Sequence, residues 1–271
     1  MPARIFLFVT ILLLFLSDAQ AQYFAFGKNK VQYRNFEWNY VQSRHFDVYF
    51  TEGGEYLARF TADACEAAYE TIRKDFNYDI NNRISIIVMK SHNDFQQNNV
   101  ISEYLPEGVG GVTELYKNRI VIPFEGDYKK FRHVIHHELI HAVVNDLVYG
   151  GSLQNAISNN IRVQVPLWFN EGIAEYQSLE WDTNSDMFLM DAVINNYLAP
   201  IPQLYGYFAY RGGQSVWRFV SEKYGREKIG EIMARLRATR SVDAAFRGSI
   251  GLSVEELSEK MATRTKSRLL A

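Results

Sequence analysis

The sequence predicts an α+β protein with an N-terminal lobe of a small mixed sheet and a helix, followed by a mostly helical lobe. Short runs rich in β-branched and aromatic residues, typical of strands, lie in residues 22–125. In residues 126–271 the apolar residues recur at helical spacing instead. Strand runs followed by helix runs favour the α+β class, here as one domain of two lobes.

Residues 1–21 are expected to be a secretory signal peptide. A positively charged start precedes 12 uncharged residues, 5–16, and Ala19 and Ala21 are small residues that signal peptidase accepts. The apolar run is shorter than the roughly 20 residues needed to span a bilayer. We therefore expect cleavage after Ala21, export to the periplasm or the extracellular space, and no stable membrane insertion of the mature protein.

The first lobe is expected to contain four strands and one long helix. Residues 45–50 alternate as a strand does, and residues 83–90 form a β-branched run suited to a buried strand. Two more strands are expected on either side of a turn at residues 116–118. Residues 55–76 carry apolar side chains at helical spacing. Because no histidine or basic cluster adjoins Cys65 in this helix, we expect a core residue and not a reactive thiol.

The second lobe is expected to consist of helices with recognisable start signals. Asp127 can cap a helix that runs through Val148, and Pro166 suits the first turn of another that ends near Glu180. Further helices are expected over residues 187–198, 214–224 and 227–236, and after a capping box formed by Ser253 and Glu256.

Composition narrows the classes of partner. The 29 basic and 31 acidic residues give a net charge of −2, so no broad cationic field exists and no nucleic-acid partner is expected. Aromatic residues make up 14% of the chain, which leaves carbohydrate binding as a weaker alternative because they are spread throughout and suit a core. A single cysteine cannot build a thiolate site, so any metal would bind histidine and carboxylate.

Four of the six histidines fall within nine residues of one predicted helix. Among them, His137 and His141 enclose Glu138 in the pattern H-E-x-x-H. At about 100° per residue the two imidazoles lie about 40° apart and can bind one metal ion, with Glu138 on the flank of that face. His136 points away from this face and is expected at the surface or hydrogen-bonded. His133, one turn upstream, is a weaker candidate for a substrate contact.

A third ligand is expected from the next helix, in the segment PLWFNEGIAEY. Glu171 and Glu175 are four residues apart and share one face, and Gly172 would let this helix approach the first one closely. His137, His141 and Glu171 would bind one Zn2+ and leave a position open for water, as catalytic sites do. Glu175 is placed to accept the other ring N–H of a ligating histidine.

The motif HHELIHAVVND and the motif WFNEGIAEY resemble those of the gluzincin metallopeptidases, which include thermolysin and the zinc aminopeptidases; 29 residues lie between His141 and the glutamate of the second motif. In order and length, the segment from Arg34 to Ser258 is most similar to a bacterial peptidase-MA-like domain. The resemblance implies a zincin-like architecture and a secreted zinc metallopeptidase that acts on a peptide or protein substrate.

By this resemblance, His137 and His141 are zinc ligands, Glu171 is the third ligand, and Glu138 is the general base toward a zinc-activated water. Glu175 falls where gluzincins often carry an acidic residue behind the ligands. The glycine-rich exopeptidase signature of the zinc aminopeptidases is not visible in the strand region, so aminopeptidase activity is unsupported.

Gluzincins commonly stabilise the oxyanion with a tyrosine or histidine of the helical lobe. Tyr205, Tyr207 and Tyr210 precede a predicted helix, and Tyr210 is preferred, with simple packing as the alternative for each. In this group the strand ahead of the metal helix pairs with an extended peptide, which implies residues 110–114 as that strand and Gly111 and Val112 as substrate contacts. A bulge or turn is the alternative there.

A catalytically silent, peptidase-like binding module is the main competing hypothesis. Peptidase-MA-like domains often form the front part of longer periplasmic or surface proteins, and this chain ends inside its last predicted helix. A C-terminal partner domain missing from this chain is therefore an open expectation. Glu138 favours activity, because a scaffold that only binds a metal needs no general base.

Overall fold

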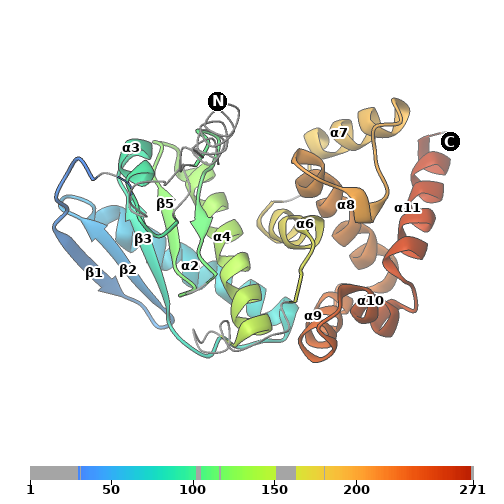
Figure 1. The fold of residues 1–271 in the computed structure, drawn as a ribbon, viewed down its shortest axis with the longest axis horizontal. Helices are drawn as coiled ribbons and strands as arrows, with labels where there is room; N and C mark the ends of the chain where they lie inside the picture. The colour runs from blue at the N-terminus through green and yellow to red at the C-terminus, as the bar shows by residue number, and fades with distance from the viewer. Residues whose placement is uncertain are drawn as a thin grey trace, which may run out of the picture.

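A computed structural model describes residues 30, 32–101, 105–115, 117–150, 163–179 and 181–269. Figure 1 shows a twisted sheet with its helices on one side of the molecule and a group of helices on the other. The prediction of an α+β chain, with the sheet first and helices after it, is confirmed. The predicted signal peptide lies outside the described residues. None of the helices described is long and apolar enough to cross a membrane.

The sheet is mixed, as predicted. Its strands are β1 (Trp38–Gln42), β2 (Phe46–Thr51), β3 (Ile84–Met89), β4 (Val112–Thr113) and β5 (Ile120–Pro123), in the spatial order β1-β2-β3-β5-β4. β2, β3 and β5 are parallel, whereas the edge strands β1 and β4 are antiparallel to their neighbours. The two-residue β4 therefore forms one edge of the sheet.

One face of the sheet packs against α2 (Glu55–Phe76) and α4 (Tyr128–Tyr149). Alternate residues of β2 and β3, such as Phe46 and Ile86, point to this face and are fully buried. Cys65 of α2 is buried in the same core, which confirms the prediction, and burial raises the pKa of its thiol. The short helix α3 (His92–Gln96) packs on β3 and β5 with a smaller apolar cluster.

α4 carries the H-E-x-x-H motif and is tied down along its length. The carboxylate of Asp127 accepts hydrogen bonds from two backbone N–H groups of the first turn, as predicted for an N-cap. Gly150 ends the helix with a φ of 71°, in the left-handed region that glycine tolerates. In the turn before β5, the side-chain amide of Asn118 donates to the carbonyl oxygen of Ala142 at 2.9 Å. These contacts fix the motif relative to the sheet.

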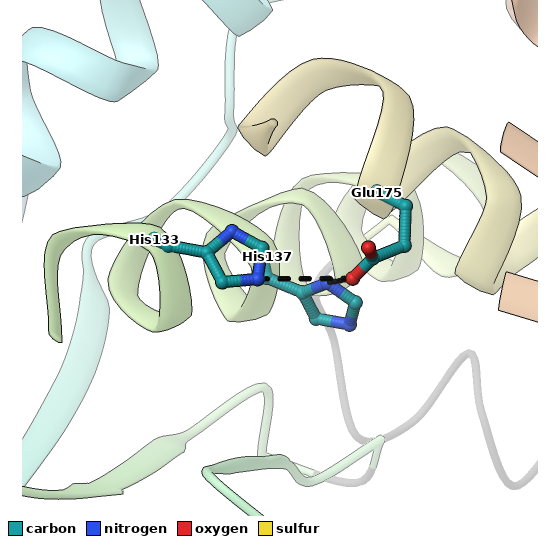
Figure 2. Close-up of side chains that lie close together, drawn as sticks. All are labelled: His133, His137 and Glu175. Carbon is teal, nitrogen blue, oxygen red and sulfur yellow. Dashed lines mark ion pairs between the residues drawn. The ribbon is translucent and has the colours of Figure 1, made fainter. Parts of the chain in front are cut away.

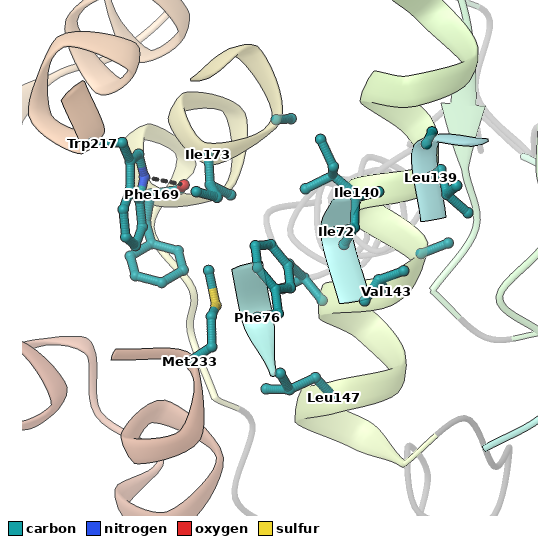
Figure 3. Packing of buried hydrophobic residues seen from close by; sticks show 14 of the residues in the cluster. Ile72, Phe76, Leu139, Ile140, Val143, Leu147, Phe169, Ile173, Trp217 and Met233 are labelled. Atoms are coloured by element: carbon teal, nitrogen blue, oxygen red, sulfur yellow. Dashed lines mark hydrogen bonds between the residues drawn. The ribbon is translucent and has the colours of Figure 1, made fainter. Parts of the chain in front are cut away.

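The remaining described chain is helical. Its elements are α6 (Leu167–Ser178), α7 (Thr183–Ile194), the short 3-10 helix η1 (Ile201–Gln203), α8 (Tyr207–Tyr224), α9 (Lys228–Thr239), α10 (Val242–Ile250) and α11 (Val254–Leu269). α6 packs between α4 and α8 (Figure 1). In Figure 3, side chains of these helices meet in one core, where the indole N–H of Trp217 donates to the carbonyl oxygen of Phe169 at 3.1 Å.

Two glycines allow α6 to lie close to α8. A side chain at Gly172 would collide with the backbone of Gly213, and one at Gly213 would collide with the carbonyl oxygen of Trp168. The expectation that Gly172 lets α6 approach α4 is therefore wrong, since the close approach is to α8. The sequence shows that a backbone comes near Gly172, and only the packing shows which backbone.

The predicted and observed elements differ in three informative places. β1 is missing from the prediction because most of its side chains are exposed, so it lacks the alternation of a half-buried strand. α8 begins at Tyr207 and not at residue 214, because the packing of Gly213 against α6 outweighs the low helix propensity of glycine. α10 is also missing from the prediction, although Ser241 caps it. The capping box of Ser253 and Glu256 is confirmed.

Candidate metal centre

The three predicted ligands converge between α4 and α6. The Nε2 atoms of His137 and His141 are 3.1 Å apart. Oε2 of Glu171 lies 3.2 Å from Nε2 of His137 and 3.3 Å from Nε2 of His141. All three side chains are buried. Two imidazoles from one helix and a carboxylate from the next thus present one ligand atom each to a common point.

The spacing of these atoms fits a tetrahedral metal ion. Zinc binds imidazole nitrogen and carboxylate oxygen at about 2.0–2.2 Å, so two donors at the tetrahedral angle lie about 3.3 Å apart. The three observed separations run from 3.1 to 3.3 Å. Two nitrogens and one oxygen, without thiolate, are the donor set of a catalytic zinc site with one position left for another ligand.

The electrostatics of the centre favour a positive charge between its carboxylates. Burial alone would lower the pKa of His137, but hydrogen bonds to Glu171 and Glu175 outweigh burial and raise this pKa to about 10. Burial would raise the pKa of Glu171, but hydrogen bonds with His137 and His141 lower it to about 2. Either a proton or a metal cation can supply the positive charge that the carboxylates of Glu171 and Glu175 stabilise.

Glu175 holds the other side of His137. Its Oε1 lies 3.1 Å from Nδ1 of His137 and 3.8 Å from Nε2 of His133, and Figure 2 shows the carboxylate reaching from α6 to both rings on α4. Its Oε2 lies 3.4 Å from the guanidinium of Arg211 on α8. When Nδ1–H of His137 donates to Glu175, Nε2 is left with a lone pair toward Glu171 and His141.

His133, His137 and Glu175 also lie close enough together to hold an ion. They do not form an independent site, because His137 would have to share its two nitrogens between two ions and Arg211 already brings a positive charge to Glu175. His133 does not border the cleft beside the ligands, so the weak expectation of a substrate contact finds no support. Burial lowers the pKa of His136 to about 4, and its Nε2 has no hydrogen-bond partner in the described chain.

The candidate ligands border a cleft of about 860 Å³. The predicted site residues around it are Gly111, Val112, His137, Glu138, His141, Glu171 and Tyr210. Gly111, directly before edge strand β4, and Val112, its first residue, thus border the same cleft as the ligands. Their role as substrate contacts stays a prediction.

Glu138 follows His137 and meets β4. Its Oε2 accepts a hydrogen bond from the hydroxyl of Thr113 at 2.6 Å, and its side chain is 7% exposed. A Cβ at Gly111 would lie 2.8 Å from Cγ of Glu138. A carboxylate in this position, in the same cleft as the ligands, can exchange a proton with a group held there.

Tyr210 lies within α8, and its ring stacks on His137 with centroids 6.2 Å apart and planes 13° apart. Burial and the charge of Glu171 raise the pKa of its hydroxyl, which therefore keeps its hydrogen for donation. Tyr205 and Tyr207 are 78% and 60% exposed and do not border the cleft. The geometry agrees with the preference for Tyr210, whose catalytic role stays a prediction.

The centre includes two contacts that the sequence does not predict. Thr113 lies in the segment expected to pair with the substrate but binds Glu138, and Arg211, to which the sequence assigns no role, pairs with Glu175. Each residue comes from an element distant along the chain, so no local spacing could have linked it to its partner. Two further atoms beside the ligands, Nδ1 of His141 and Oδ1 of Asn170, are buried without a hydrogen-bond partner in the described chain. Asn170 directly precedes Glu171 and borders the cleft, so its place in the second motif was a usable signal.

The chain belongs to the Peptidase MA superfamily, whose sequence profile matches residues 64–267. The resemblance drawn from the two motifs is thereby confirmed at the level of this family. No curated protein matches the chain.

Solved structures of an M1 zinc metallopeptidase from Deinococcus radiodurans, one of them a point mutant, are similar to 82% of this chain. The sequence identity is 13% and the TM-score is 0.42 in both comparisons. The chain spans about half the length of that protein, 50% and 49% in the two structures. This likeness is weak, so family membership rests on the sequence match.

Proposed function

We propose that the protein is an exported zinc-dependent peptidase that hydrolyses peptide bonds, with Glu138 as general base. The observation that carries the proposal is the convergence of two imidazoles and a carboxylate at zinc-like spacing in a cleft that also contains Glu138. Membership of the Peptidase MA superfamily supports the same chemistry. Export is proposed from the signal-like residues 1–21.

His137, His141 and Glu171 would hold the zinc ion. Bound there, zinc would act as a Lewis acid that lowers the pKa of a coordinated water to about 7 and polarises a peptide carbonyl. Glu175 would keep Nδ1–H of His137 hydrogen-bonded, which fixes the orientation of the ring and leaves Nε2 free to bind.

Glu138 would transfer protons, and Tyr210 would stabilise the negative charge of the transition state. Glu138 can take a proton from the attacking water and return it to the leaving amine, because its carboxylate lies in the cleft beside the ligands. Tyr210 can donate its hydroxyl hydrogen to the oxygen that becomes negative in the transition state. Its raised pKa keeps that hydrogen in place at neutral pH.

The substrate would lie along β4 as an extended peptide. β4 is an edge strand of the sheet, and Gly111, directly before it, and Val112, its first residue, border the cleft. An edge strand binds a peptide through backbone hydrogen bonds, which places a peptide bond near the centre without requiring a particular sequence.

Metal analysis and a peptide-library assay of residues 22–271 test the proposal. We expect close to one zinc per chain and cleavage that a chelator abolishes and added zinc restores. Glu138→Gln should keep the zinc and lose cleavage by about 10²- to 10⁴-fold, the usual worth of a general base. Glu125→Gln is the matched control, because Glu125 pairs with His92 and does not border the cleft.

The outcomes separate the candidate functions. Zinc binding without cleavage of any library peptide would support the silent binding module instead. Cleavage that survives Glu138→Gln would refute the assigned base while leaving the metal site intact.

A further inference from the structure

The hydroxyl of Thr113 is the closest polar partner of Glu138. Thr113 lies on β4 and is half-buried. Its Oγ1 is 2.6 Å from Oε2 of Glu138 and 3.0 Å from the backbone carbonyl oxygen of Glu138. Thr113 and Glu138 are 25 positions apart along the chain, so this contact exists only because β4 packs against α4.

A threonine hydroxyl has one hydrogen to donate, so only one of these two acceptors receives it at a time. The distance to Oε2 lies in the short range typical of a hydroxyl donating to a carboxylate. The backbone oxygen of Glu138 belongs to the interior of α4, where the helix supplies its own N–H donor. The carboxylate is therefore the principal acceptor, and Oε2 is the anchored oxygen.

Gly111, directly before β4, limits Glu138 from the same side as Thr113. A Cβ at Gly111 would lie 2.8 Å from Cγ and 3.1 Å from Oε1 of Glu138, and 3.0 Å from Cγ2 of Ile122. The missing side chain leaves the space that Oε1 borders. One oxygen of the carboxylate is thus bound to a hydroxyl, and the other lies beside a position without a side chain.

We propose that Thr113 is a positioning residue for Glu138: its hydroxyl holds Oε2 and leaves Oε1 as the oxygen that exchanges protons with water and substrate. This inference rests on the proposed peptidase function. The two oxygens of the carboxylate then have different roles. An oxygen that already accepts a strong hydrogen bond takes up a proton less readily, so Oε1 is the oxygen that exchanges protons. The contact also links the base to the strand proposed to bind the substrate.

Kinetics of Thr113→Val, which removes the hydroxyl but keeps the shape, test the proposal in the zinc-loaded protein. We expect kcat to fall by about 10- to 100-fold, the worth of a hydrogen bond to a charged group, with KM changed less than about twofold. Thr113→Ser, which keeps the hydroxyl, should restore most of the loss. Zinc content should stay at the wild-type level in both variants, because the ligands are untouched.

Thr61→Val is the matched control. It removes one hydroxyl whose hydrogen bond, 2.8 Å to the carbonyl oxygen of Leu57, lies inside α2 and outside the cleft. A wild-type kcat for Thr113→Val would overturn the proposal while leaving the proposed function standing. Equal losses in the Thr113 and Thr61 variants, or no recovery in Thr113→Ser, would overturn it as well.

A double-mutant cycle measured by thermal unfolding tests the contact without any cleavage assay. If Thr113 acts through the carboxylate of Glu138, Thr113→Val should lower the unfolding midpoint in the wild-type background and lower it clearly less in a Glu138→Ala background, where only the backbone carbonyl oxygen at 3.0 Å remains as an acceptor. Equal shifts in both backgrounds would overturn the proposal. This arm decides the matter even if the wild-type protein cleaves no peptide, so failure of the inference and failure of the function remain distinguishable.

Discussion

The two sides of α4 that meet the cleft are built from different chemistry. On the ligand side, His137 and His141 face α6, where the carboxylates of Glu171 and Glu175 stabilise a positive charge. On the base side, Glu138 meets β4 through a hydroxyl and a glycine. Around the helix axis, Glu138 is rotated by about 100° from His137 and by about 60° from His141. Metal binding therefore depends on the packing of two helices, and the placement of the base depends on the fit of one strand.

The largest effect is expected for Glu171→Ala, which removes one of the three zinc ligands. Loss of one ligand out of three should weaken zinc binding by roughly 10²- to 10³-fold, since each ligand of a structural zinc site supplies about a quarter of 10–16 kcal/mol. Competition with a chromophoric chelator measures the affinity. The exposed Glu125→Gln should bind zinc like the wild type. Unchanged affinity in Glu171→Ala would remove Glu171 from the site.

Gly111→Ala should disturb the placement of Glu138 without affecting zinc binding. The new methyl group would displace the side chain of Glu138, and a shift of up to about 1 Å costs as much as 10²-fold in rate. We expect kcat to fall by about that factor while the zinc content stays at one. Gly108→Ala is the control, because a Cβ there meets nothing within 4 Å. Loss of zinc in Gly111→Ala would show that the two sides are coupled.

Glu175→Gln should have a smaller effect on zinc binding than Glu171→Ala. Glu175→Gln keeps a hydrogen-bond acceptor for Nδ1–H of His137 but removes the charge, so zinc affinity should fall by about 10-fold. The chelator titration used for Glu171 measures it. An affinity equal to the wild type would mean that Glu175 serves packing and its ion pair with Arg211 only.

The smallest effect concerns the pH dependence of the metal-free protein. The pKa of His137 is about 10 in the folded chain against an ordinary 6.5, so its stabilisation is complete below pH 6.5 and is lost as the pH rises through 10. The pKa of Glu171 is about 2 against 4.5, so its stabilisation is complete above pH 4.5 and is lost as the pH falls through 2. The contribution of this pair is thus greatest between pH 4.5 and 6.5.

Thermal unfolding of chelator-treated protein as a function of pH measures the contribution of His137 and Glu171 to stability. The unfolding midpoint should fall by a few degrees between pH 6.5 and 9, and zinc should flatten the curve by replacing the proton on His137. Glu171→Gln should weaken the alkaline dependence, because it removes one of the two carboxylates that raise the pKa of His137. An equally steep curve in that variant would contradict the assignment.

Much of the fold could be predicted because its signals are local. The helix at residues 55–76 has its observed bounds, since its apolar spacing and the glycines before it lie in one stretch of chain. Asp127 caps α4 through side-chain contacts within three residues. β1 and the first two turns of α8 escaped prediction, because exposure in the first and a buried glycine contact in the second hide the local pattern.

The spacing of the H-E-x-x-H motif is enough to place His137 and His141 on one face of α4 with Glu138 beside it, because helical rotation is the same wherever a helix forms. Three other features depend on how distant elements pack: α6 places Glu171 at zinc-like spacing, Gly172 meets α8, and β4 brings a hydroxyl to the base. These contacts join segments 25 to 41 positions apart, and their geometry follows from how the elements pack, which no local pattern encodes.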